Sequence, residues 1–319
     1  MRFQGFIPSR PVARSRPLSG LLPLVMLPLL SSAPSFAAHL TPATSQAWNE
    51  YVESADARMA KRLSPGTPFL WMDEEPDRLA RVRAGELVVS PIGPQIPKKV
   101  PSGLIHDWIG AVFVPNTSLS DVLQVVRDYA RYKDLYQPGV IDCKVIATGE
   151  DKDRFSMLLM NKALLLKTAF DADYESRYVQ VDEHRAYSIS RTTRVQEIAD
   201  YGSTEQHVLN AGEGNGIIWH LMGITRFLQR DGGVYIELEA LGLSRDIPAA
   251  IRWFVEPTVR RVSRDALSTS LEQTEKAVRI HSELANRDAG SASGSPTTRR
   301  VGQSLLGGEA IKFHVRPQP

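Results

Sequence analysis

The apolar residues near the end of the chain repeat with the period of one long helix. Between Asp246 and Val278, one face carries Ile251, Val255, Val259, Val262, Ala266, Leu267, Leu271, Thr274 and Val278. Charged residues fill the opposite face, so the pattern predicts an amphipathic α-helix. Asp246 and Pro248 suit its first turn, and Pro257 predicts a kink because the stripe keeps its phase across it. A helix of about 30 residues is about 45 Å long, so it needs a broad apolar sheet face to cover it.

The segments before this helix alternate with the period of β-strands. Residues 103–115 ("GLIHDWIGAVFVP") predict a first strand, and residues 117–139 predict a helix capped at Ser118 or Ser120. Six further strands are predicted in residues 140–149, 154–161, 163–181, 185–198, 216–230 and 233–244. Their connections are short and polar, and the Asp-Gly-Gly run at 231–233 is typical of a hairpin. Consecutive strands without helices between them imply an antiparallel sheet.

These strands and helices form a main domain, which we place at residues 103–284. The rest of the chain divides into a leader (residues 1–37), an N-terminal helix with an arm (38–102) and a tail (285–319). Residues 38–102 begin with an amphipathic helix over 41–63 and continue as a proline-rich arm, in which "GELVVSPIG" predicts one short strand. We expect the arm to wrap onto the main domain because the apolar residues at 69–72 require burial. Residues 285–319 are rich in Gly, Ser and Pro, a composition typical of a disordered tail.

Residues 1–37 have the order of a secretory signal peptide. They start with four arginines and no acidic residue, continue with the apolar run Leu18–Leu30, and end in small residues. The apolar run is too short to span a bilayer unaided. We therefore expect cleavage near Ala37 and a periplasmic or secreted protein. A lipoprotein is excluded because the single cysteine is Cys143, far from that cleavage position.

Removal of residues 1–37 changes the balance of charge. The whole chain has 38 Lys and Arg residues against 36 Asp and Glu residues, a net charge of +2. Without the four leader arginines the balance is 34 against 36, or −2. A nearly neutral protein lacks the electrostatic basis for binding nucleic acid, and we expect no nucleic-acid partner.

Few residues carry recognisable chemistry. Cys143 permits no internal disulfide and lies in a strand pattern, where we expect it to be buried; a reactive thiol is the alternative. The histidines are scattered without a His-x-x-x-His pair, and "GEGNG" (212–216) precedes a strand pattern rather than a helix. We therefore expect neither a metal nor another cofactor.

The order of elements resembles a known fold. A strand, a helix, six antiparallel strands and a long C-terminal helix, over 103–284, resemble the helix-grip fold of the START-like (SRPBCC) superfamily, which includes polyketide cyclases and coenzyme-Q-binding START-like proteins. The segments "GLIHDWIGAVFVP", "RDGGVYIE" and "SRDIPAAIRWFVEPTVRRVSRDALSTSLEQTEKA" are similar to those of uncharacterised secreted members. The resemblance implies an α+β fold in which a curved antiparallel sheet wraps around the C-terminal helix.

The same resemblance implies a cavity for an apolar ligand between sheet and helix. Because such pockets are mostly apolar with few polar anchors, we expect the lining to include Trp108, Tyr129, Tyr136, Trp219, Leu221, Phe227, Tyr235, Trp253, Val255 and Val259. Arg191 and Arg226 are the candidate anchors for an anionic head group. The alternative for the aromatic residues is that they are ordinary core.

Two glutamates share one face of the predicted strand 233–244. Glu237 and Glu239 can each pair with Arg226 or Arg230 across the hairpin, as a surface pair of small effect. The alternative is a buried anchor or a general acid/base carboxylate in the pocket.

Three functions remain open at this stage. The leading hypothesis is an exported protein that binds a hydrophobic small molecule, such as a lipid, a quinone or a polyketide-like compound. The second is a cyclase- or hydrolase-like enzyme that uses Glu237 or Glu239 with a nearby Tyr or His. The third is an interaction module that docks a partner through the proline-rich arm and the N-terminal helix. Peripheral contact with a membrane is left open, as is the oligomeric state.

Overall fold

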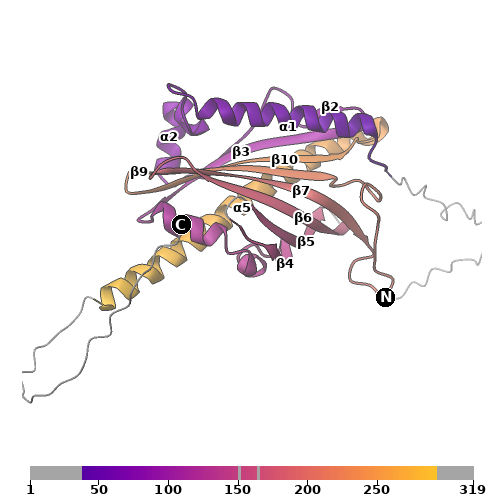
Figure 1. The fold of residues 1–319 in the computed structure, drawn as a ribbon. Helices are drawn as coiled ribbons and strands as arrows, with labels where there is room; N and C mark the ends of the chain where they lie inside the picture. Colours follow the sequence, from indigo (N-terminus) through magenta and orange to yellow (C-terminus); the bar gives the residue numbers. More distant parts are fainter. Residues whose placement is uncertain (1–37, 150–151, 164–165, 293–319) are drawn as a thin grey trace, which may run out of the picture. The chain divides into compact units, whose positions relative to one another are not determined.

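The computed structural model describes residues 38–149, 152–163 and 166–292, drawn in colour in Figure 1. The expected signal peptide lies outside the described residues, as does the expected tail beyond residue 292. Residues 285–292 were also expected in the tail, but they form the last turns of the C-terminal helix. The expectation was wrong there because extending an existing helix fixes only one residue for each hydrogen bond gained, which overrides local composition.

One antiparallel sheet of ten strands forms the centre of the fold (Figure 1). The strands are β1 (Val88–Pro91), β2 (Lys98–Val100), β3 (Gly103–Pro115), β4 (Val140–Ala147), β5 (Asp153–Ala163), β6 (Leu166–Gln180), β7 (Arg185–Ala199), β8 (His207–Val208), β9 (His220–Arg230) and β10 (Gly233–Arg245). Their order is β1-β3-β10-β9-β7-β6-β5-β4, with β2 also beside β3 and β8 also beside β7. All seven strands predicted for the main domain are present, as is the one predicted in the arm.

Two of the described helices, α1 and α3, begin with side-chain caps. The helices are α1 (Pro42–Arg62), η1 (Trp71–Glu74), α2 (Pro76–Arg83), α3 (Leu119–Val126), η2 (Tyr129–Arg131), α4 (Tyr132–Leu135) and α5 (Ala249–Ala292). Thr41 caps α1, and Ser118 and Asp121 cap α3 reciprocally. The helix expected over 117–139 is divided into α3, η2 and α4, and the arm contains two short helices that the sequence did not predict.

The two faces of the sheet are covered by different parts of the chain. The face that α5 covers is called the inner face; there Leu267 and Leu271 pack with Val112 of β3 and Ile236 of β10. On the other, outer face, α1 and the arm pack over β3, β9 and β10, in a core that includes Met59 and Trp71. In Figure 1 the sheet separates α1 from α5. Odd-numbered residues of β3 point outward and even-numbered ones inward, as strand alternation requires.

The second half of α5 completes the inner core, whereas the first half does not. Within α5 the first buried residue is Leu267, and the helix runs unbroken through Pro257. Contact with β3 is close at Gly110, where a Cβ atom would stand 2.7 Å from Cδ1 of Leu271, so a larger residue there would force the Leu271 side chain to move. Among the described helices, none has a stretch long and apolar enough to cross a membrane.

Candidate functional site

A row of stacked aromatic rings forms part of the inner face. Phe155 of β5 lies between Tyr129 of η2, at 4.2 Å between ring centroids, and Tyr174 of β6, at 5.3 Å. Tyr132 and Tyr136 of the α4 segment pack edge-on to the same group. These five rings are called the aromatic wall. Such pairs add about 0.5–1.5 kcal/mol each beyond the burial of their area, so the wall is a rigid surface.

The hydroxyl groups of the wall tie it to the neighbouring helices. Tyr132 donates to the carbonyl oxygen of Val126 at the end of α3, and Tyr136 shares a hydrogen bond of 3.0 Å with Thr274 of α5. Burial raises the pKa of both phenols. They therefore stay neutral at physiological pH, and the wall offers an apolar, uncharged surface.

Beyond the wall, apolar residues of the inner face are only half-buried. They are Met157 and Leu159 of β5, Ile217 and Ile218 before β9, and Leu221 of β9, all in contact with the core around the wall. The first half of α5 has the same character: Val255, Val259 and Val262 are half-buried, and Ile251 is 48 % exposed. Two apolar surfaces are thus present without being fully covered.

His106 is buried between the sheet and the first half of α5, at Ser263. Its Nε2 atom lies 3.0 Å from Oγ of Ser244 on β10, and its Nδ1 atom lies 3.4 Å from Oγ of Ser263 on α5. Burial lowers the pKa of His106 to about 4. The imidazole is therefore neutral in the folded protein at neutral pH, and both of its nitrogens have a hydroxyl neighbour.

Acidification is expected to weaken the fold through His106. The unfolded chain binds this proton below about pH 6.5 and the folded protein only below about 4, so stability is lost as the pH falls between these values. The free energy of unfolding of the wild type, relative to His106→Gln, should drop by about 3 kcal/mol from pH 7 to pH 4. Urea titrations at several pH values measure it.

The exposed His207 on β8 supplies the control for that experiment. His207→Gln removes a histidine that the fold does not bury. If the wild type and His106→Gln lost stability in parallel on acidification, the assignment of the effect to His106 would be incorrect.

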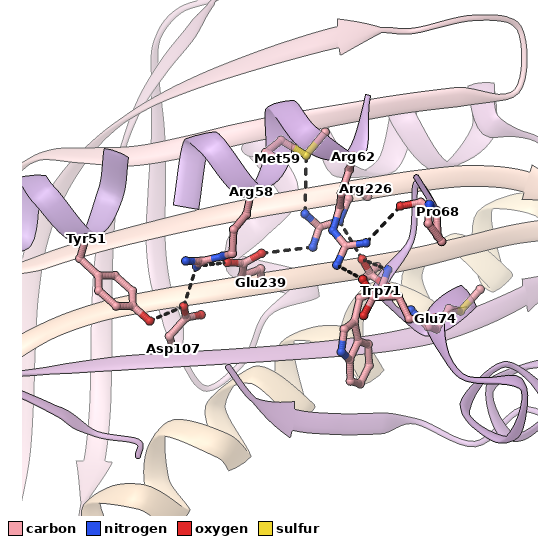
Figure 2. Close-up of polar contacts among 12 residues, drawn as sticks. Tyr51, Arg58, Met59, Arg62, Pro68, Trp71, Glu74, Asp107, Arg226 and Glu239 are labelled. Carbon is pink, nitrogen blue, oxygen red and sulfur yellow. Dashed lines mark hydrogen bonds and ion pairs between the residues drawn. The ribbon is translucent and has the colours of Figure 1, made fainter. Parts of the chain in front are cut away.

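A network of charged side chains is buried on the outer face, beneath α1 (Figure 2). Arg226 of β9 donates to Glu237 at 2.7 Å and to Glu239 at 3.2 Å, and the three side chains are 0–3 % exposed. Both carboxylate oxygens of Glu237 also accept hydrogen bonds from the arm, from the backbone N–H groups of Trp71 and Met72. The network therefore fixes the start of η1 against the centre of the sheet.

The network continues along α1 to β3 (Figure 2). Arg58 of α1 donates to Glu239 at 2.7 Å and to Asp107 at 3.0 Å, and Tyr51 of α1 donates to the same oxygen of Asp107 at 2.9 Å. Oδ1 of Asp107 is buried without a partner among the described residues. Burial, and then the charge of Glu239, raise the pKa of Asp107 to about 7, although Arg58 acts in the opposite direction.

The expected lining residues divide between the two faces. Trp108, Tyr129, Tyr136, Leu221 and Phe227 lie in the cores of the inner face. Trp219 and Tyr235 lie in the outer core instead, so they cannot line a site between sheet and α5. Trp219 precedes the first residue of β9, and strand alternation therefore does not fix its direction; Tyr235 alternates with Ile236, which points inward.

The α5 residues expected in the lining differ in exposure. Val255 and Val259 are half-buried, as a cavity wall requires, but Trp253 is 79 % exposed. Helical spacing explains the difference, because residue 253 is two positions from residue 255 and points to another side of the helix.

The expected polar anchors have protein partners already. Arg226 is occupied by Glu237 and Glu239 on the outer face. Arg191 donates to both carboxylate oxygens of Asp56 on α1, on the same side of the sheet. Strand alternation in the sequence predicted that Arg226 pairs with Glu237 or Glu239. It favoured a pair at the surface, because the sequence did not show that α1 covers these strands. Arg230 pairs with Asp73 of the arm.

Two hollows are lined by described residues, and neither includes the aromatic wall. One, of about 460 Å³, lies at the start of α5 beside Arg252, Trp253 and Arg260. The other, of about 570 Å³, lies between α3 and the β6–β7 hairpin, beside Leu123 and Gln180. No group of three or more His, Cys, Asp or Glu residues in the described part of the chain is arranged to hold a metal ion, and Cys143 is buried.

Solved structures with a similar arrangement were found, although no family model and no curated protein matches the chain. A STAR-related lipid transfer protein from Xanthomonas axonopodis is 17 % identical, with 61 % of this chain and 98 % of that chain covered and a TM-score of 0.37. Human STARD10 is 10 % identical, with 72 % and 88 % covered and a TM-score of 0.39. The Zhui aromatase/cyclase from Streptomyces is 12 % identical, with 60 % and 99 % covered and a TM-score of 0.34.

The chain has the helix-grip arrangement. Because the TM-scores lie below 0.5, this conclusion rests on the chain's own topology: one open antiparallel sheet, a short helical segment after its long strand β3, and a long C-terminal helix across its inner face. The α+β fold that the sequence predicted is therefore confirmed.

Proposed function

We propose that this protein is exported after loss of residues 1–37 and binds a hydrophobic small molecule between the inner face of the sheet and α5. The observation that carries the proposal is the incomplete burial of two apolar surfaces. Leu221 and Met157 on the sheet are half-buried, and so are Val255 and Val259 on α5. Burying an apolar side chain of this size from full exposure is worth about 1.5–3 kcal/mol, so a ligand that covers the remaining exposed part of several of them gains a fraction of that amount from each.

The character of the inner face favours an uncharged ligand. The aromatic wall is neutral, and the acidic group beside it, Asp153, is paired with Arg127 and accepts a hydrogen bond from Tyr129. Nε1 of Trp108, on the same face, is buried without a hydrogen-bond partner among the described residues. One unmatched donor among apolar residues suits a molecule with a carbonyl or hydroxyl oxygen on an apolar body, such as a lipid, a quinone or a polyketide-like compound.

Filling the inner face should displace such a ligand. Leu221→Trp adds a large apolar side chain where Leu221 is half-buried, beside the aromatic wall. We expect the wild type to retain an apolar molecule in roughly stoichiometric amount in native mass spectrometry, and Leu221→Trp to retain less than about a tenth as much. Organic extraction then identifies the molecule.

Val208→Trp is the matched control, because Val208 is 53 % exposed on β8, away from the wall. It should retain the ligand in full. A wild-type protein that stays empty after exposure to a total lipid extract would contradict the proposal, as would equal retention by the wild type and Leu221→Trp.

The two alternative functions receive less support. Glu237 and Glu239 are buried and ion-paired on the outer face, so neither is a free carboxylate beside the aromatic wall. The arm, which was expected to dock a partner in the third hypothesis, turns Phe69, Leu70 and Met72 into the outer core.

A further inference from the structure

The first half of α5 has an exposed face that carries aromatic residues, a proline and arginines. The six residues are Trp253, Phe254, Pro257, Arg260, Arg261 and Arg264, and every one is exposed. Pro257 is three or four positions from both aromatic residues, and Arg264 is three or four positions from Arg260 and Arg261, so the six form one broad side of the helix. This set is called the aromatic–arginine face. It extends over about 16 Å of helix.

The aromatic end of this face is an unusual surface for a soluble helix. Trp253 is 79 % exposed and Phe254 is 66 % exposed, and their rings contact each other at 5.8 Å between centroids. Ile251, one turn away, is 48 % exposed. Single exposed apolar residues are common on proteins, but a cluster that includes two adjacent aromatic rings marks an interaction surface.

The charge of the segment identifies what this surface fits. Between residues 249 and 265 there are four arginines and two acidic residues, Glu256 and Asp265. Three of the arginines lie on the aromatic–arginine face itself, the exposed Asp265 lies at its edge, four positions after Arg261, and Arg252 is held by Asp246 at 3.0 Å. The segment is therefore positively charged on balance. The hollow of about 460 Å³ at the start of α5 is lined by Arg252, Trp253, Pro257 and Arg260 together with Glu256, so arginines outnumber acidic residues in its lining.

We propose that the aromatic–arginine face docks the protein on an anionic lipid bilayer. Tryptophan and phenylalanine are the side chains that amphipathic helices insert into the headgroup region, and arginines on such helices bind acidic headgroups. Trp253 and Phe254 enter the interface, and Arg260, Arg261 and Arg264 contact phosphate groups along the next turns of α5.

A second copy of the chain fits this face less well than a bilayer does. In a symmetric dimer the same patch lies on both partners, so six arginines would be brought into one interface. Like charges placed together at an interface oppose association. An anionic bilayer satisfies both the aromatic rings and the arginines.

Vesicle flotation with the chain from Ala37 to Pro319, which forms one compact unit, tests the proposal. Residues 1–36 are omitted because their apolar run would bind lipid by itself. We expect binding to vesicles of phosphatidylglycerol and phosphatidylcholine in equal parts, and at least about tenfold weaker partitioning to pure phosphatidylcholine, since each arginine near an anionic surface contributes about fivefold. Raising the ionic strength should weaken binding to the anionic vesicles.

Two sets of variants separate the aromatic and electrostatic contributions. Trp253→Ala/Phe254→Ala should lower the partition coefficient at least about tenfold, and Arg260→Gln/Arg261→Gln/Arg264→Gln about a hundredfold. The control is Ile280→Ala/Leu284→Ala on the same helix, because these residues are also exposed, by 47 and 55 %, but lie outside the aromatic–arginine face. It should bind like the wild type.

The proposal fails if the wild type does not float with anionic vesicles, or if the aromatic double variant binds as the wild type does. It also fails if sedimentation shows a wild-type dimer that Trp253→Ala/Phe254→Ala dissociates, since the face would then be covered by a second copy. Unchanged circular dichroism and melting temperature in all variants exclude loss of the fold as the cause of weaker binding.

Discussion

Replacing Arg226 by methionine is expected to lower the free energy of unfolding by about 3–5 kcal/mol. Methionine has a similar length but no charge, so Glu237 and Glu239 lose their shared partner while both remain 0–3 % exposed. Breaking a buried ion pair from one side is costly because the remaining charge keeps its desolvation penalty. Urea denaturation of the wild type and Arg226→Met measures the loss.

Arg230→Met is the matched control, since it removes an arginine from the same strand. Arg230 is 36 % exposed and pairs with Asp73 at the surface of the arm, so its loss should cost no more than about 1 kcal/mol. A triple variant, Arg226→Met/Glu237→Gln/Glu239→Gln, should recover part of the stability that Arg226→Met loses. If Arg226→Met and Arg230→Met lowered the free energy of unfolding equally, the prediction that Arg226 compensates buried charges on Glu237 and Glu239 would be wrong.

Asp107→Asn is expected to make the protein more stable than the wild type at pH 8 and equally stable near pH 4. The folded protein binds a proton at Asp107 up to about pH 7, and the unfolded chain only up to about 4. The folded state thus binds more protons between these values, so the contribution of Asp107 is fully present below pH 4 and is lost as the pH rises toward 7. At about 1.4 kcal/mol per pH unit, the difference between wild type and Asp107→Asn should approach about 4 kcal/mol.

The composition of the network explains that direction. Two arginines, Arg58 and Arg226, face three carboxyl groups, so one negative charge is in excess when all are ionised. Asparagine resembles the protonated acid and can still accept a hydrogen bond from Tyr51. The test is to measure the free energy of unfolding of the wild type and Asp107→Asn from pH 4 to pH 8. Asp56→Asn is the control, because Asp56 forms an exposed ion pair with Arg191. A constant difference across the pH range would contradict the prediction.

Local sequence patterns predicted most of the fold because most strands and helices bury one face, so their apolar residues repeat with the period of a strand or a helix. The run "GLIHDWIGAVFVP" is β3 in full, and alternation placed Met222, Ile224 and Arg226 together on one side of β9. The long helix was predicted from its stripe, but its extent was underestimated by more than three turns at the end. The first half of this helix was expected to cover the sheet, but its apolar residues are only half-buried. A helical repeat of apolar residues predicts that one face is apolar; it does not predict what packs against that face.

The burial of the charged residues was not predictable from the same patterns. Alternation shows that Glu237 and Glu239 share a face, but whether that face meets water depends on α1, whose Arg58 lies 181 residues before Glu239. A signal was present in the arm, whose apolar run at 69–72 required a surface to cover. The outer face of β9 and β10 is that surface.

The pairing of β3 with β10 sets the order in which this chain can fold while it is being made. β3 leaves the ribosome early, yet its full-length neighbour extends to Arg245, so the central ladder of the sheet waits until most of the chain has been synthesised. Contacts over such sequence separations form slowly, and until then the apolar edge of β3 is open to other chains. The outer core, which β3 and β10 share, therefore cannot be completed before residues up to Arg245 have been synthesised.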